Sequence, residues 1–140
     1  MLHKGSYETL SATFDELFEW VESKRVPIMR TIGIYWDNPE FVDEAKLRSA
    51  ACVEIPTNYQ FIDNGGLPID IMQIVGGNYA MTRFVGPYEK LEPVWVEFTA
   101  YVENTLGRKI TKDPAFEVYV NDPAKTPASE LITELFMPVV

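Results

Sequence analysis

The chain of 140 residues contains one cysteine, Cys52, and one histidine, His3. A single cysteine excludes an intrachain disulfide, and its apolar neighbours favour a buried, inert thiol. One imidazole and one thiol are too few for a Cys/His metal centre and make a Ser-His triad improbable, so we expect no metal and no cofactor. The pairs Gly65-Gly66 and Gly76-Gly77 open no helix, so we interpret them as turns and not as phosphate-binding loops.

Positive charge and long apolar runs are also scarce. Lys and Arg total 12 against 21 Asp and Glu, which gives a net charge of −9. This balance repels phosphates, so we expect no direct binding of nucleic acid, and it attracts cations. A well-solvated acidic surface is the plain alternative. No signal peptide or membrane span is visible, so we expect a cytoplasmic protein without membrane contact.

The sequence has enough apolar residues, 46% with 13% aromatic, for one compact domain. Its main feature is an internal repeat, in which residues 3–22 match residues 84–103 at an offset of 81. The matched pairs are Tyr7/Tyr88, Leu10/Leu91, Phe14/Trp95, Leu17/Phe98 and Val21/Val102. Their spacing of three and four predicts an amphipathic helix after a glycine turn in each copy.

The repeat continues at an offset of 84, where Ile34–Pro39 matches Val118–Pro123. Leu47 and Ser49 then match Leu131 and Thr133. A three-residue insertion between helix and strand explains the change of offset, and loops tolerate such insertions. We therefore predict one domain over 1–140, with repeat one at about 1–60 and repeat two at about 69–140.

The expected elements are two helices and about six strands. One helix runs from the N-cap Ser6 to about Lys24, and the other runs from Pro87 to near Gly107. The predicted strands lie within 28–36, 50–55, 69–75, 78–85, 116–120 and 133–137, with a tight hairpin at Gly76-Gly77. This pattern favours an α+β fold of tandem pseudo-twofold β-α-β-β repeats. We expect a curved antiparallel sheet with two long helices on one face.

Repeat one lacks the strand that opens repeat two. Leu2 and His3 align only with Arg83 and Phe84. An unpaired sheet edge invites another strand, so we expect a second chain or a repositioned segment to cover it, and a homodimer stays open.

Alternation along the strands separates two faces. Glu117 and Tyr119 point opposite to Phe116, Val118 and Val120. In repeat one, Gly33 and Tyr35 oppose Ile32, Ile34 and Trp36. We expect the aliphatic face to meet the helices and the face with Glu117, Tyr119 and Tyr35 to be either solvated or a concave pocket. Aromatic walls around one carboxylate suit an aromatic cation.

Several motifs together resemble the GyrI-like family of small-molecule-binding domains, which also occur as effector domains of AraC-type and MerR-type regulators. They are 5-GSYE-8, 33-GIYWDNP-39, 77-GNYA-80, 86-GPY-88, 116-FEVY-119, 121-NDP-123 and 138-PV-139. The resemblance implies a ligand cavity at the junction of the repeats. It also implies that Glu117, the glutamate of the Phe-Glu-x-Tyr motif, binds cationic hydrophobic compounds. The candidate ligand-binding residues are Glu117, Tyr119, Tyr35, Trp36, Tyr79 and Phe136. Strand parity places Trp36 in the core, whereas its position at a strand end suits a cavity rim, and we interpret Trp95 and Trp20 as core.

The leading hypothesis is a stand-alone protein that binds cationic, aromatic or amphipathic compounds, as in multidrug binding. Regulators of the family carry a helix-turn-helix domain ahead of this one, and nothing precedes Met1, so we do not expect operator binding. Two alternatives remain open by the same resemblance. One is a hydrolase of reactive genotoxic compounds that uses Glu117, although we expect binding without turnover. The other is an inhibitor that contacts DNA gyrase.

Overall fold

The computed structural model describes residues 1–61 and 63–140. The chain forms two compact units, Met1–Ile74 and Val75–Val140. Within the described residues, each unit has one long helix and three antiparallel strands in the order β-α-β-β. The α+β class expected from the sequence is therefore confirmed. No helix in the described part of the chain is long and apolar enough to cross a membrane.

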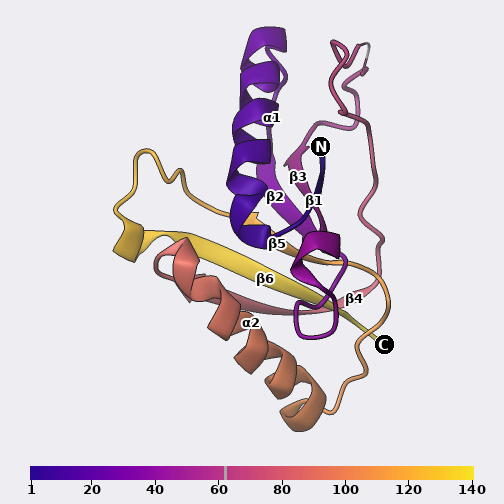
Figure 1. Ribbon diagram of the computed structural model, residues 1–140, viewed down its shortest axis with the longest axis vertical. Helices are drawn as coiled ribbons and strands as arrows, with labels where there is room; N and C mark the ends of the chain where they lie inside the picture. The colour runs from indigo at the N-terminus through magenta and orange to yellow at the C-terminus, as the bar shows by residue number, and fades with distance from the viewer. Residues whose placement is uncertain (62) are drawn as a thin grey trace. The chain divides into compact units, whose positions relative to one another are not determined.

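In the first unit, β3 (Arg48–Glu54) lies between β1 (Leu2–Lys4) and β2 (Arg30–Tyr35) and pairs with both (Figure 1). A 3-10 turn at Tyr7–Thr9 leads from β1 into α1 (Leu10–Lys24). The hydroxyl of Ser6 accepts the backbone N–H of Glu8 at 3.2 Å, which caps the start of this turn. The predicted helix start at Ser6 and end near Lys24 are confirmed.

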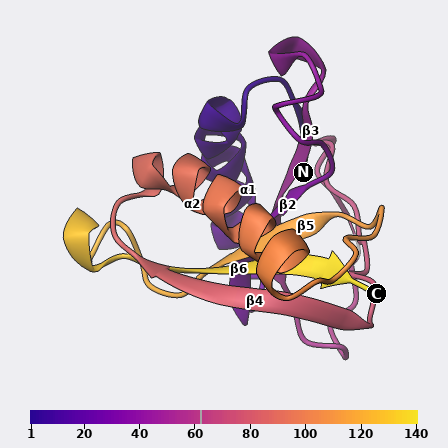
Figure 2. The ribbon, with the colours of Figure 1, turned by 90° about the horizontal axis from the view of Figure 1, so that it is seen from below.

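In the second unit, β6 (Ile132–Val139) lies between β4 (Asn78–Val85) and β5 (Ala115–Tyr119). Figure 2 shows α2 (Leu91–Ala100) running along β4 and β6. The helix continues as a π-helical turn over Tyr101–Thr105. Gly107 then takes a φ of 62°, and the N–H of Arg108 donates to the carbonyl of Val102 at 3.0 Å. This left-handed closure confirms the predicted end near Gly107.

The backbone hydrogen bonds repeat between the units with the same offsets as the sequence. Gly5 N–H donates to Leu47 O at 2.8 Å, and Gly86 N–H donates to Leu131 O at 2.8 Å. Trp36 N–H donates to Arg48 O at 3.1 Å, and Val120 N–H donates to Ile132 O at 3.0 Å. The two units therefore share one fold and differ in their side chains.

Each helix buries the predicted apolar stripe on its own sheet. Leu10, Leu17 and Val21 of α1 form a core with Ala51 of β3. The equivalent core of the second unit consists of Leu91, Phe98, Val102, Leu135 and Met137. Burial of these side chains supplies the main driving force for folding of each unit.

The predicted hairpin at Gly76-Gly77 is wrong. Residues 69–75 form no strand, and Ile71 and Val75 are 54% and 53% exposed. β4 instead pairs along its whole length with β6, which begins 47 residues after β4 ends. The apolar composition of 69–75 suggested a strand, but these side chains have no common buried face, and Ile69 alone packs into the first core.

The opening strand of the first unit is short but present, which corrects the expectation that it is missing. β1 pairs Leu2 with Ala50, the position equivalent to the pairing of Arg83 with Glu134. β1 therefore matches the last three residues of β4. Three residues are too few for alternation to indicate a strand, and hydrogen bonds to β3 decide it.

The alternation along β2 and β5 is correct, but the assignment of the two faces is wrong. Gly33 pairs with Ala51, and Glu117 pairs with Leu135, so both lie on the face that their own helix covers. The opposite face is buried as well, since Ile34 and Val118 are 1% and 3% exposed. When both faces of a strand are buried, apolar content no longer tells which face meets the helix.

Candidate functional site

Glu117 lies in the middle of β5 and is a buried carboxylate, with 4% of its surface exposed. The indole N–H of Trp95 donates to its Oε1 at 2.5 Å. The hydroxyl of Tyr119 donates to its Oε2 at 2.6 Å. A carboxylate is retained inside a protein when such bonds replace those it made with water.

Local structure explains why these three side chains meet. Glu117 and Tyr119 are two residues apart on one strand, so they point to the same face. Trp95 lies on α2 between Leu91 and Phe98, which pack on the neighbouring Leu135 and turn this side of the helix toward the sheet. The site therefore forms where α2 crosses β5.

A second aromatic ring extends the site from Tyr119. The rings of Tyr88 and Tyr119 are 5.4 Å apart at 63°, an edge-to-face contact. Burial raises the pKa of Tyr88, and the negative charges of Glu117 and Asp122 raise it further. The charge of Glu117 therefore acts on the neighbouring hydroxyl of Tyr88.

The first unit has the aromatic residues of this arrangement without its carboxylate. Tyr7 and Tyr35, the repeat partners of Tyr88 and Tyr119, make an edge-to-face contact at 4.9 Å and 72°. Gly33 takes the place of Glu117, and Phe14 takes the place of Trp95. Sequence reasoning took Trp95 for core. The signal that could have identified it is that Trp95 and Glu117 both differ from their repeat partners.

The structure groups some of the predicted site residues and separates others. Glu117 and Tyr119 are hydrogen-bonded. In the first unit, Tyr35 packs beside that unit's core, and the backbone N–H of Trp36 bonds Arg48 O. Their membership of one ligand site with Glu117 stays a prediction.

Tyr79 and Phe136 belong to an aromatic cluster around Phe116. Phe116 stacks on Phe136 at 4.6 Å and meets Tyr79 edge-on at 5.3 Å. Because Phe116 neighbours Glu117 along β5, this cluster lies on the opposite face of the strand. A role for Tyr79 and Phe136 in binding is a separate prediction from the role of Glu117.

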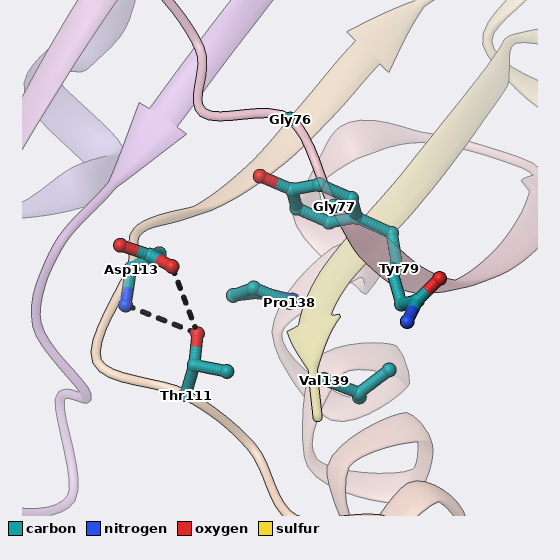
Figure 3. Close-up of a pocket in the computed structure, with 8 residues that line it drawn as sticks. Gly76, Gly77, Tyr79, Thr111, Asp113, Pro138 and Val139 are labelled. Carbon is teal, nitrogen blue, oxygen red and sulfur yellow. Dashed lines mark hydrogen bonds between the residues drawn. The ribbon is translucent and has the colours of Figure 1, made fainter.

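Tyr79 also lines a small hollow of about 60 Å³ at the start of β4, shown in Figure 3. Its hydroxyl donates to Val75 O at 2.7 Å. Burial raises the pKa of Tyr79, and the nearby charge of Asp113 adds to this effect. The other lining residues are Gly76, Gly77, Asn78, Thr111, Asp113, Pro138 and Val139. The hollow has room for about two water molecules.

The described residues contain no group of three or more His, Cys, Asp or Glu side chains that could hold a metal ion. Cys52 has a thiol whose pKa is raised by burial, which makes it a poorer nucleophile.

Comparison with known proteins gives a consistent result. A family model described as GyrI-like small molecule binding domain matches residues 1–140. A DNA gyrase inhibitor of Escherichia fergusonii is 28% identical over 137 residues, which cover 97% of this chain and 86% of that protein.

Two solved structures have a similar fold. The structure of SAV2435 bound to tetraphenylphosphonium has a TM-score of 0.63 at 14% identity, covering all of this chain and 84% of that one. The EcmrR–DNA complex has a TM-score of 0.68 at 15% identity, covering 97% of this chain and half of that one. The comparisons give the hydrolase alternative no support, because likeness to a solved hydrolase of Listeria innocua at 15% identity shows the fold alone.

Proposed function

The chain belongs to the family of GyrI-like small-molecule-binding domains, and from this premise we propose that it binds a cationic aromatic compound through Glu117. The observation that carries the proposal is the buried carboxylate of Glu117 among Trp95, Tyr119 and Tyr88. Bound cations gain from the charge of the carboxylate and from the faces of the rings.

Burial strengthens this attraction. A carboxylate in a partly dry site interacts with a cation several times more strongly than one in bulk water, because less solvent screens it. Burial raises the pKa of Tyr88, and the same charge of Glu117 raises it further. The net charge of −9 also raises the concentration of cations near the surface.

The solved relative with bound tetraphenylphosphonium supplies a probe for this chemistry. Tetraphenylphosphonium carries one positive charge and four aromatic rings. Triphenylphosphine oxide is a neutral compound of related shape. A protein that recognises charge as well as aromatic surface prefers the first of the two.

The test is a calorimetric titration of both compounds into the wild type, Glu117→Gln and Glu134→Gln. Glu117→Gln keeps the shape of the side chain and removes its charge, so tetraphenylphosphonium should bind about 5- to 150-fold more weakly, the equivalent of about 1–3 kcal/mol. Binding of triphenylphosphine oxide should not change. Glu134 is the matched control, because it lies on β6 beside β5, pairs with Arg83 at 3.0 Å and contributes nothing to the Glu117 site.

Equal affinity of wild type and Glu117→Gln for the cation would contradict the proposal, as would an equal loss of both compounds. Mass spectrometry of the recovered probe should show an unaltered compound, which separates binding from turnover. A circular dichroism spectrum of Glu117→Gln identical to that of the wild type ensures that weaker binding is not caused by unfolding.

Contact with DNA gyrase is a second candidate, supported by the name of relatives 28–32% identical to this chain. The measurement is supercoiling by purified gyrase in the presence of increasing amounts of the protein. Inhibition that Glu117→Gln leaves intact would place a gyrase-contacting surface outside the Glu117 site. Full supercoiling activity at protein excess would dismiss this candidate.

A further inference from the structure

The first unit contains a hollow of about 340 Å³ that does not involve any residue of the Glu117 site. Its walls are Trp20 and Lys24, one turn apart on α1, together with Tyr59 and Asp63 from the segment that follows β3. The volume falls in the range of small-molecule sites. One aromatic residue and one charged residue come from each wall.

Trp20, which lines this hollow, has an indole N–H with an unusual environment. Trp20 is 8% exposed, and its Nε1 has no hydrogen-bond partner among the described residues. The ring of Phe61 packs against the indole in a tilted contact, with centroids 5.9 Å apart at 38°, and Gly65 lies near the indole Nε1. A buried donor without a partner destabilises the fold, so a ligand acceptor that bonds this N–H gains more than one that replaces water.

Comparison of the repeats shows that the fold itself does not require this indole. The partner of Trp20 in the second unit is Tyr101, at an offset of 81, and it is 52% exposed. The same helix position is therefore a buried, unpartnered donor in one unit and a surface residue in the other. Packing of the helix alone does not account for the indole.

The charges of the hollow indicate the kind of ligand. Lys24 and Asp63 have opposite charges and line the same hollow, and no ion pair joins them within the described part of the chain. One oxygen of Asp63 accepts the N–H of Gly65 at 2.9 Å. A ligand that carries a carboxylate and an ammonium group would match both charges at once.

We propose that this hollow binds a zwitterionic aromatic compound of the amino-acid class. The ligand carboxylate accepts hydrogen bonds from Trp20 Nε1 and Lys24 Nζ, its ammonium group contacts Asp63, and its ring packs on Tyr59. The turn at Gly65 and Gly66 is held by bonds to Asp63 and Asn64 within the same turn. Because Gly65 lies near Trp20 Nε1, the ligand carboxylate can reach the indole only if this turn shifts, and Asp63 would shift with it.

The test uses the indole N–H signals of the full chain in a ¹H–¹⁵N NMR spectrum. The sequence has three tryptophans, so three signals are expected, and the variants Trp20→Phe, Trp36→Phe and Trp95→Phe assign them. L-Phenylalanine should shift the Trp20 signal saturably and leave the Trp95 signal in place. 3-Phenylpropanoate lacks the ammonium group and 2-phenylethylamine lacks the carboxylate, so each should bind at least about 10-fold more weakly.

Lys24→Gln and Asp63→Asn should each weaken the binding of L-phenylalanine at least about 10-fold. Lys46→Gln and Asp43→Asn are matched controls, since they make the same charge changes in the same unit beside the short turn at Glu44–Lys46, away from the hollow. A Trp20 signal that does not respond, equal binding of the three probes, or equal affinity of the site and control variants would overturn the proposal.

A second titration with tetraphenylphosphonium reports on the Trp95 signal. Failure at Trp20 and failure at Trp95 are thus separate results for the two sites.

Discussion

Trp95 on α2 donates its indole N–H to Glu117 on β5 across 2.5 Å, and in the repeat both partners are replaced together. Phe14 and Gly33, at the equivalent positions of the first unit, have neither the donor nor the acceptor. Either polar group alone would be buried without this partner, which is costly. The pair therefore behaves as one feature, and it distinguishes the second unit from the first.

Trp95→Phe should lower the free energy of unfolding by about 1–3 kcal/mol, because Glu117 loses a hydrogen bond while most of the ring volume is kept. Urea denaturation of the wild type, Trp95→Phe, Glu117→Gln and the double variant measures this coupling. The double variant should be less destabilised than the sum of the single variants. Gln still offers a carbonyl oxygen to the indole, so strict additivity would show that the charge of Glu117 adds nothing to this hydrogen bond.

Asp37 accepts a backbone N–H and also forms an ion pair, whereas its repeat partner Asn121 has only the first of these two roles. Asp37 accepts the backbone N–H of Arg48 at 2.9 Å and forms an ion pair with the Arg48 guanidinium at 2.8 Å. Asn121 accepts the equivalent N–H, that of Ile132, at 2.9 Å. Asp37→Asn should therefore cost at most about 1 kcal/mol, the scale of a surface ion pair. Asp37→Ala should cost about 1–3 kcal/mol more, because the backbone N–H loses its partner.

The ion pair of Asp37 and Arg48 also makes the stability of the fold depend on pH. The hydrogen bond from Arg48 holds the pKa of Asp37 below its usual value. The stabilisation is therefore complete above the pKa of Asp37 in the unfolded chain and is lost as the pH falls through the lower folded value. Urea denaturation from pH 6 to pH 2 should show a shallower loss of stability for Asp37→Asn than for the wild type. Parallel curves would refute a contribution of Asp37.

Tyr7 should make stability fall at high pH. Its hydroxyl donates to Asp37 O at 2.6 Å, and burial raises its pKa to about 12. The unfolded chain loses this proton near pH 10, so stability decreases between about pH 10 and 12, as the pH rises toward the folded pKa.

Tyr7→Phe should reduce this decrease without removing it, since burial also raises the pKa values of Tyr79 and Tyr88. Thermal unfolding followed from pH 8 to pH 11.5 provides the comparison. An unchanged slope in Tyr7→Phe would count against a raised pKa at this residue.

Gly5 and Gly86 are repeat partners that differ in the space around them. Both have positive φ, 119° and 153°, which L residues rarely adopt. A Cβ at Gly86 would lie 2.7 Å from Cζ of Phe84, whereas a Cβ at Gly5 would meet nothing within 4 Å. Gly5→Ala should cost about 1–3 kcal/mol from backbone strain, and Gly86→Ala should cost about 1–3 kcal/mol more from the clash. Melting temperatures of the two variants decide whether the ranking holds.

The repeat was predictable from sequence because its signals are local. Glycine turns, a helical stripe and Asn/Asp-Pro turns each depend on neighbouring residues, and all are found in both units. The absence of a strand at 69–75 was not predictable in the same way. Apolar composition resembles a strand, but strand formation needs a partner with free hydrogen-bonding groups, and no local pattern encodes that partner.

The sequence by itself determined that Glu117 and Tyr119 share a face of β5, since side chains alternate with a period of two. It could not determine whether that face is the one covered by a helix. Alternation sorts side chains into two sets and does not show which set the helix covers. Tertiary structure decided this through Leu135, which pairs beside Glu117 and packs under α2, so that the carboxylate meets Trp95. The buried indole of Trp20 has the same origin, since only the folded chain brings Gly65 and Phe61 against a residue more than 40 positions earlier.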